Sequence, residues 1–309
     1  MSKILSTQRF PFLIDGGLSN VLESQGCNLE HKLWSASVLE ANPDKILKAH
    51  LAYLEAGAKC IITSSYQASF KGFFELGYST EQSNGLLLKS VALAQKAVDI
   101  FMLDKEKDFR PLVAASIGPY GAYLADGSEY TGDYGVSKEQ LQQFHLPRIE
   151  LLDNTTADCF ACETIPSFEE AIVLSDLLKR SQKPAWVSFS CKDGTHISDG
   201  TDIRKCGLLF KAHPNVFAVG INCTKPKYIS ELIRALKESV GDKKIIVYPN
   251  SGEMYESATK TWLGTSSLDA FVRMAKSWIN EGADIIGGCC RIGPKHIKKL
   301  DEVLLNRTK

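Results

Sequence analysis

The 309-residue chain lacks an excess of charge of either sign, since Lys and Arg together number 36 and Asp and Glu together also number 36. A balanced chain has no electrostatic footprint for nucleic acid and no polybasic signal for a membrane surface. We therefore expect neither a nucleic-acid partner nor a membrane partner, and the sequence leaves the oligomeric state open.

Long apolar runs are also absent. No stretch approaches the roughly 18 apolar residues that a membrane span needs. The first fifteen residues lack the apolar core and small-residue cleavage site of a secretory signal. We therefore expect a cytoplasmic protein whose nine cysteines serve as thiols, metal ligands or catalytic groups rather than as a disulfide framework.

A third absence is the Gly-x-Gly-x-x-Gly motif before the first helical pattern, which disfavours a dinucleotide-binding sheet. The chain instead alternates short apolar runs with longer amphipathic stretches. The strand-like runs are 12–14, 59–63, 112–117, 158–162, 185–190, 217–221, 245–248 and 284–286. The helical patterns include 43–56, 82–100, 137–154, 167–180, 228–240 and 267–281. This alternation predicts an α/β fold, a single (β/α)8 TIM barrel that one domain forms over residues 1–309.

Polar residues follow nearly every predicted strand. They include Asp15, Tyr66, Glu163, Asn222 and Cys289. In a (β/α)8 barrel the active site lies at the C-terminal ends of the strands. A chain with a purely structural role has no reason to gather polar groups there, so we expect a functional site at this end.

Most of the cysteines have a structural interpretation. A single buried cysteine usually behaves as a small hydrophobic side chain, and we assign this role to Cys27, Cys60, Cys191 and Cys206. A C-x-x-C motif lies at 159–162, inside a predicted strand. Residues three apart in a strand point to opposite faces, so we expect no shared site at this motif.

The vicinal pair Cys289–Cys290 is more unusual. Two glycines precede it and permit close backbone approach and unusual dihedral angles. They favour a turn that brings both sulfurs to one ion, although simple packing and a strained disulfide stay open. Cys223, at the end of another predicted strand, supplies a third sulfur. Zinc takes tetrahedral thiolate ligands, and three protein ligands leave the open position of a catalytic zinc.

The combination of Ile221-Asn222-Cys223 with Gly287-Gly288-Cys289-Cys290 resembles the homocysteine S-methyltransferase family, and in particular its S-methylmethionine-dependent members. The resemblance runs from about residue 10 to about residue 300. Other matching stretches are 15–17, 33–36, 65–68, 118–130, 161–164, 198–201 and 248–253. The fold that this resemblance implies is again a single (β/α)8 barrel.

The resemblance also implies roles for individual residues. Cys223, Cys289 and Cys290 would hold Zn²⁺. Asp15 and Glu163 would bind the homocysteine amino group. Asn222 belongs to the same substrate site. By analogy with other backbone anion sites, we expect the backbone amides around Gly16 and Gly17 to receive the homocysteine carboxylate.

The implied chemistry needs no protein nucleophile. A free alkyl thiol with a pKa of about 8.5 is mostly protonated at neutral pH, and zinc coordination deprotonates it. The homocysteine thiolate then attacks a methyl group on a sulfonium donor. Trp34 matches a family position near the donor and would hold its cation with an aromatic face. Tyr66 and Tyr120 are further candidates for this contact, and core packing is the alternative for each. The long segment 118–135 would cover the donor pocket, which favours S-methylmethionine over betaine and leaves S-adenosylmethionine open as a second donor.

Three alternatives remain open at the level of sequence. One is a betaine-dependent homocysteine methyltransferase. Another is a redox protein that uses the vicinal cysteines and carries no stoichiometric metal. The third is a non-catalytic barrel with a structural zinc, which needs four protein ligands. No histidine follows a predicted strand directly, so we expect surface or loop positions for His31, His50, His145, His196, His213 and His296.

Overall fold

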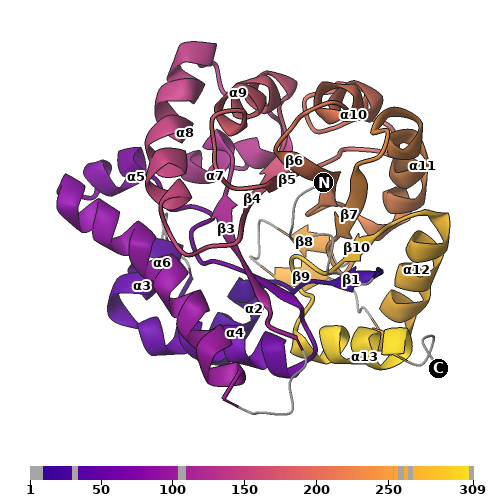
Figure 1. Ribbon diagram of the computed structural model, residues 1–309, viewed down its shortest axis with the longest axis horizontal. Helices are drawn as coiled ribbons and strands as arrows, with labels where there is room; N and C mark the ends of the chain where they lie inside the picture. Colours follow the sequence, from indigo (N-terminus) through magenta and orange to yellow (C-terminus); the bar gives the residue numbers. More distant parts are fainter. Residues whose placement is uncertain are drawn as a thin grey trace.

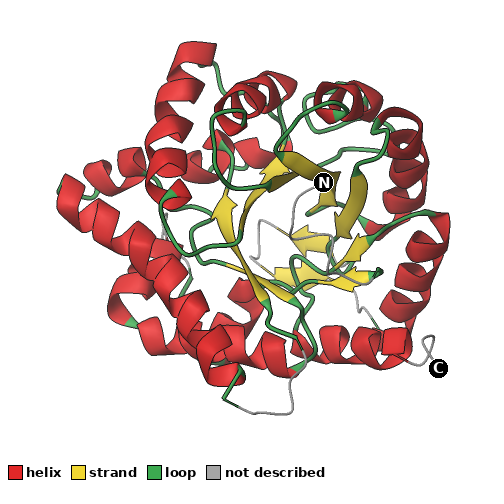
Figure 2. Cartoon of the chain, in the orientation of Figure 1, coloured by secondary structure: helices red, strands yellow, loops and turns green. Residues whose placement is uncertain are grey.

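A computed structural model describes residues 10–29, 34–103, 109–252, 254–256, 261–263 and 267–305, with only the backbone of 34–36, 254–256, 261–263 and 305. Eight parallel strands form a ring inside a layer of helices (Figure 1), and Figure 2 shows the same separation of strand from helix. Their order in the sheet is β1 (Phe12–Leu13), β10 (Ile285–Ile286), β7 (Lys244–Tyr248), β6 (Val216–Asn222), β5 (Ala185–Phe189), β4 (Cys159–Ile165), β3 (Leu112–Ile117) and β2 (Cys60–Ile62).

The ring closes between its first and last strands. Ile14 forms a parallel bridge with Cys60. The backbone N–H of Lys59 donates to the carbonyl of Leu13 at 2.8 Å, and that of Asp15 donates to the carbonyl of Cys60 at 3.1 Å. The fold is therefore a (β/α)8 barrel, and all eight predicted strands are confirmed in position.

The helices that cover the barrel are listed here in chain order. They are α2 (Leu18–Ser24), α3 (Trp34–Ala41), α4 (Pro43–Glu55), α5 (Phe70–Glu75), α6 (Thr80–Phe101), α7 (Tyr120–Leu124), α8 (Lys138–Asp153), α9 (Phe168–Leu178), α10 (Ile203–Phe210), α11 (Ile229–Ser239), α12 (Leu268–Glu281) and α13 (Pro294–Leu305). Two 3₁₀ turns, η1 (Ser128–Tyr130) and η2 (Pro226–Tyr228), and an antiparallel hairpin of β8 (Met254–Glu256) with β9 (Thr261–Leu263) complete the set. Within the described residues, none of the helices is both long and apolar enough to cross a membrane.

Serine caps explain where several of the predicted helices begin. Ser79 and Ser137 each form a capping box with the glutamine three residues later, and Ser167 and Ser267 accept hydrogen bonds from the backbone three residues on. Such caps satisfy amides that the first turn leaves unpaired. The six predicted helices are confirmed to within three residues at each end.

The strands are buried on both faces, which explains their continuous apolar runs. One apolar cluster fills the barrel interior and includes Cys60, Cys159 and Trp186. A larger cluster lies between the barrel and the helices and includes Cys162. Cys159 and Cys162 thus point to opposite faces of β4, and the prediction that they share no site is confirmed.

The prediction for the histidines was wrong in two cases. His50 in α4 and His145 in α8 are buried, because each faces the core from its helix. His213 lies in the loop after α10, as predicted, and is buried as well. Nε2–H of His213 donates to the carbonyl of Ser175 at 2.8 Å, and His145 belongs to a charged network. His50 has no hydrogen-bond partner among the described residues.

Candidate active site

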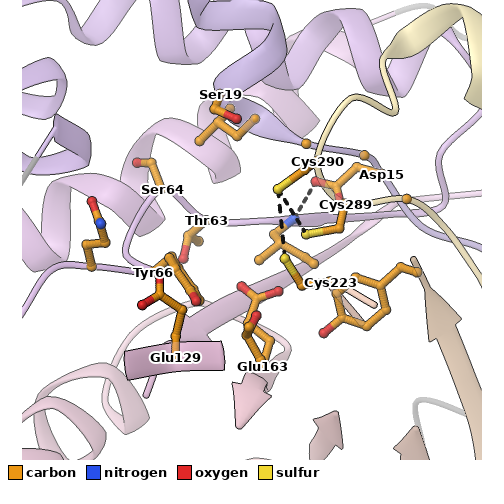
Figure 3. A pocket seen from close by; sticks show the side chains of 18 of the residues that line it. Asp15, Ser19, Thr63, Ser64, Tyr66, Glu129, Glu163, Cys223, Cys289 and Cys290 are labelled. Carbon is orange, nitrogen blue, oxygen red and sulfur yellow. Dashed lines mark hydrogen bonds between the residues drawn. The ribbon is translucent and has the colours of Figure 1, made fainter. Parts of the chain in front are cut away.

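A cavity of about 360 Å³ opens at the C-terminal end of the barrel (Figure 3). Its volume lies within the range of small-molecule sites. Residues at the ends of β1, β2, β4, β6, β7 and β10 line it, and so does the segment 118–135. The carboxylate, thiol and phenol side chains that line it include Asp15, Tyr66, Glu129, Tyr130, Glu163, Cys223, Cys289 and Cys290.

Three cysteines meet on one side of the cavity. The Sγ atom of Cys290 lies 3.8 Å from that of Cys223 and 4.0 Å from that of Cys289. All three sulfurs lie within 4.8 Å of one another. Among the described residues, no histidine, aspartate, glutamate or further cysteine joins this cluster as a fourth ligand. The structure therefore brings together the three sulfurs that the sequence singled out, with room for one more ligand.

Close packing against Ile14, just after β1, and against Ile292 explains the two glycines before the vicinal pair. A Cβ atom on Gly287 would lie 2.3 Å from Cγ1 of Ile14, and one on Gly288 would lie 2.0 Å from Cγ2 of Ile292. The expected close approach is thus observed. The unusual dihedral angles fall elsewhere, since φ is +67° at Arg291 and +49° at Cys223. A non-glycine residue in this region is strained, and such strain is common at functional sites.

The three thiols are electrostatically unequal. Hydrogen bonds from Cys223 and Cys289 lower the pKa of the Cys290 thiol well below its usual value. The hydrogen bonds to Cys223 and Cys290, followed by burial, raise the pKa of Cys289. Without a bound metal, the ionised form of Cys290 is therefore favoured and that of Cys289 is disfavoured. A divalent cation would also favour the ionised form of Cys289, so the cluster is suited to binding one.

Two buried carboxylates border the same cavity. Burial raises the pKa of Asp15 well above its usual value, and the charge of Glu163 raises it further. Burial also raises the pKa of Glu163 to about 7, against hydrogen bonds from Ser116 and Tyr248. No ion pair joins either carboxylate to a cationic side chain of the described chain. A bound cation would therefore stabilise both groups.

Both carboxylates are held firmly. The backbone N–H of Ile62 donates to Oδ2 of Asp15 at 2.8 Å. The register between β4 and β5 shifts between Cys162 and Ile165, so Glu163 lies at an irregularity in the ladder. Bulges of this kind re-aim side chains next to active sites, and here Glu163 lines the cavity.

Two predicted substrate residues already form hydrogen bonds within the chain. Asn222 does not line the cavity; its side chain accepts from the Thr164 N–H and donates to Oγ1 of Thr164, both at 2.7 Å. It thus fixes Thr164 at a φ of +61°. The N–H of Gly17 donates to the carbonyl of Ile292 at 2.9 Å and is already used. Gly16 and Gly17 both line the cavity.

The three aromatic residues predicted to bind the donor lie in different surroundings. Tyr66 lines the cavity. Tyr120 does not: its ring packs 4.9 Å from that of Phe144, and its hydroxyl accepts from Nζ of Lys71 at 2.9 Å. Tyr120 therefore packs in this aromatic cluster and is not among the residues that line the cavity. Trp34 is the first residue of α3, and its side chain lies outside the described residues.

The sequence did not single out Glu129 and Tyr130, which the η1 turn brings into the cavity. The Tyr130 hydroxyl lies 3.3 Å from Sγ of Cys223, within hydrogen-bond reach of a thiolate there. The only signal in the sequence was the length of the Gly- and Tyr-rich segment 118–135. Long structured loops are often functional, but length alone does not select two of its residues.

A buried network behind the cavity anchors this segment at both ends. Oε1 of Glu170 accepts from the Tyr120 N–H at 2.7 Å, and Oε2 accepts from the Tyr134 hydroxyl at 2.8 Å. Nε2 of His145 lies 2.7 Å from the same Oε1, and Arg148 donates to Nδ1 of His145 at 2.9 Å. His145 is therefore neutral with its proton on Nε2, which agrees with a pKa that burial lowers.

Comparison with known proteins extends these observations. A family model described as homocysteine S-methyltransferase matches residues 12–304. The chain is 46% identical over 296 residues to the homocysteine S-methyltransferase YbgG of Bacillus subtilis (strain 168), covering 94% of each. It is 43% identical to the selenocysteine Se-methyltransferase of Brassica oleracea var. italica, covering 96% of this chain and 89% of the relative. The crystal structure of the metallated homocysteine methyltransferase MmuM from Escherichia coli superposes with a TM-score of 0.87 at 41% identity, covering 97% and 98%.

The fold and the thiol cluster first define a class, a (β/α)8 barrel with a three-thiol site at its C-terminal mouth. Within that class, the chain belongs to the homocysteine S-methyltransferase family, a family of methyl-transferring enzymes. The family match does not favour a thiol-disulfide redox protein.

Proposed function

We propose that this enzyme transfers a methyl group from S-methylmethionine to homocysteine at a zinc ion held by Cys223, Cys289 and Cys290. One observation carries the proposal. An incomplete set of three sulfurs borders a cavity that also holds Asp15 and Glu163, two carboxylates to which no described cationic side chain is paired. A thiol-bearing amino acid supplies both missing parts, a sulfur for the metal and an ammonium for the carboxylates.

The spacing of the sulfurs supports zinc as the metal. Tetrahedral zinc with Zn–S bonds of about 2.3 Å requires neighbouring sulfurs about 3.8 Å apart. The observed separations of 3.8 and 4.0 Å meet that requirement. Soft thiolate ligands select zinc over magnesium, calcium or manganese. Zinc bound there would supply a Lewis acid that keeps a substrate thiol deprotonated and nucleophilic at neutral pH.

The carboxylates would orient the acceptor. An ammonium beside Glu163 favours the ionised carboxylate, which opposes the effect of burial on its pKa. Asp15 adds a second charge from a position that the Ile62 amide fixes. With its ammonium held by these two side chains, homocysteine can direct its sulfur only toward the nearby cysteines. Such positioning converts binding energy into a lower barrier.

The reaction itself is a displacement at carbon. The acceptor thiol first loses its proton to solvent. Its sulfur then forms a bond to the methyl carbon of the donor, while the bond from that carbon to the sulfonium sulfur breaks. The electron pair of the broken bond stays on the departing sulfur, so both products are the neutral thioether methionine.

The donor choice depends on the aromatic residues and on the segment 118–135. Tyr66 and Trp34 are the candidates for holding the sulfonium, a contact worth about 0.5–2 kcal/mol. Tyr66 lines the cavity, and Glu129 and Tyr130 border it from the segment. A cavity with this number of acidic groups is suited to an amino-acid sulfonium, with S-adenosylmethionine as a weaker donor and betaine as a poor one.

The test is direct. Zinc-loaded protein is incubated with homocysteine and with S-methylmethionine, S-adenosylmethionine or betaine separately, and methionine is measured. We expect S-methylmethionine to give the highest rate, metal-stripped protein to be inactive, and re-added zinc to restore activity. Trp34→Ala should impair use of the donor more than binding of homocysteine. A highest rate with betaine would refute the donor choice, and no methionine with any donor would refute the function.

A further inference from the structure

A third carboxylate in the cavity, that of Glu129, has no role in the mechanism above. It reaches the cavity from the η1 turn. Its Oε2 atom is buried and lacks a hydrogen-bond partner among the described residues. No ion pair joins it to a described cationic side chain. A buried carboxylate oxygen without a partner is unfavourable, so this atom points to a group that the chain itself does not supply.

The position of Glu129 is fixed by packing on both sides. A Cβ atom on Gly121 would lie 2.4 Å from the backbone nitrogen of Glu129, so the glycine lets α7 lie against the η1 turn. Oγ of Ser190, just after β5, donates to the carbonyl of Glu129 at 2.9 Å. Glu170 holds the segment at Tyr120 and Tyr134. The carboxylate is therefore presented by a rigid support, as a binding residue requires.

The surroundings of Glu129 favour a cation. Burial raises the pKa of Glu129, the charges of Cys223 and Asp126 add to this effect, and backbone amides oppose it. A positively charged group beside Glu129 would lower its pKa and favour the ionised carboxylate. In Figure 3, Glu129 lies beside Tyr66, apart from Asp15 and Cys289. Homocysteine uses the side with Asp15 and the cysteines, so the cation at Glu129 belongs to the other substrate.

S-Methylmethionine carries two cations, and the chemistry separates them. The sulfonium loses its charge as the methyl group departs. A carboxylate beside it would stabilise the ground state more than the transition state and would slow the reaction. The α-ammonium keeps its charge throughout, so a carboxylate can bind it without raising the barrier. The aromatic ring of Tyr66 is the better neighbour for the sulfonium.

We propose that Glu129 binds the α-ammonium group of the methyl donor and thereby selects amino-acid sulfonium donors over sulfonium donors that lack an amino group. This inference rests on the proposed function, since it assigns the donor end of the same site.

The experiment compares two donors and two variants of the zinc-loaded enzyme. The donors are S-methylmethionine and 4-(dimethylsulfonio)butanoate, which is the same molecule without its amino group. We expect Glu129→Gln to raise KM for S-methylmethionine about 10- to 100-fold, the effect of losing a hydrogen bond to a charged group. Because binding of the ammonium is uniform between ground and transition states, kcat should change little. The KM of the deaminated donor should also change little, so the variant loses the discrimination that the wild type has.

Asp133→Asn is the matched control, because it removes a carboxylate from the same segment but outside the cavity. It should leave KM for both donors unchanged. Melting temperature, zinc content and homocysteine KM establish that Glu129→Gln is folded. Should it not fold, Glu129→Asp keeps the charge on a shorter side chain, and its KM should rise for S-methylmethionine alone.

Several results would overturn the inference. An unchanged KM for S-methylmethionine in folded Glu129→Gln is one, and an equal fall in kcat with both donors is another, since it would place Glu129 at the reacting atoms. A rise in homocysteine KM would assign it to the acceptor. These results leave the proposed function intact. A wild-type enzyme that makes no methionine from S-methylmethionine would instead overturn the proposed function, and this inference with it.

Discussion

Two buried polar clusters lie a short distance apart in this barrel, and they differ in where their partners come from. In the network of Glu170, His145 and Arg148, both carboxylate oxygens, both ring nitrogens and both terminal guanidinium nitrogens bond within the chain. In the cavity, the Cys223–Cys289–Cys290 cluster has no fourth described ligand, and the carboxylates have no described cationic partner. The closed cluster stabilises the fold, whereas the open one is ready to bind ligands.

The largest expected effect comes from the open cluster. Cys290→Ser should abolish both zinc binding and methyl transfer, because two remaining thiolates cannot retain a catalytic zinc. Metal analysis and the methionine assay on the same preparation measure the two losses. Cys191→Ser, which alters a cysteine outside the cluster, should retain both. A metal-free Cys290→Ser protein with full activity would contradict the mechanism.

The closed cluster should affect stability first. Glu170→Ala removes the carboxylate whose charge stabilises the buried Arg148 guanidinium and which accepts hydrogen bonds from Tyr120 and Tyr134. Leaving a buried charge uncompensated costs about 3–5 kcal/mol. Chemical denaturation should show this loss in the free energy of unfolding, with zinc still bound to the folded fraction. Glu169→Ala, next along α9 and exposed, is the control and should change stability little. A stable Glu170→Ala protein that loses zinc would reverse the two roles.

Glu163 tests the open cluster with a smaller change. Glu163→Gln keeps the shape of the side chain and removes the charge that faces the acceptor. Homocysteine binding should weaken by about 3 kcal/mol, on the order of 100-fold, because the ammonium loses a buried carboxylate. Calorimetric titration with homocysteine measures the change, and zinc content should stay at one per chain. An unchanged affinity would remove Glu163 from the acceptor site.

His50 belongs to neither cluster: it is buried, has no hydrogen-bond partner among the described residues, and does not line the cavity. Burial lowers its pKa from 6.5 to about 4. Between these two values the unfolded chain binds a proton that the folded chain does not, so stability falls as pH drops from 6.5 to 4. The loss amounts to at most about 3 kcal/mol. Unfolding free energies across this range should show the loss in the wild type, and His50→Leu should reduce it; an identical pH dependence in both would refute the assignment.

Much of the fold could be predicted because its signals are local. Continuous apolar runs identify strands that are buried on both faces, and serine caps mark where long helices begin. Short helices such as α5 and α7, with six and five residues, are too brief for a periodic pattern. The histidines were misplaced because a histidine in a helix carries no local sign of whether it faces the core.

The site was predictable where a residue type is itself unusual, as in the vicinal cysteines at the end of a strand. Asn222 was assigned to the substrate site by the resemblance, but its contacts with Thr164 depend on the spacing of β4 and β6. Glu129 was missed for a related reason. Its position depends on Ser190, which bonds to its carbonyl, and on Glu170, which holds the segment 118–135. Both residues are distant in the sequence, so no local pattern encodes these contacts.

The most direct test of the central claim is zinc K-edge X-ray absorption on the purified enzyme before and after homocysteine is added. Three protein thiolates and an open position predict three sulfur neighbours at about 2.3 Å, with one lighter ligand, in the free enzyme. Homocysteine should replace that lighter ligand and raise the count to four sulfurs. A metal shell already closed by four protein ligands, or one that homocysteine leaves unchanged, would contradict the account.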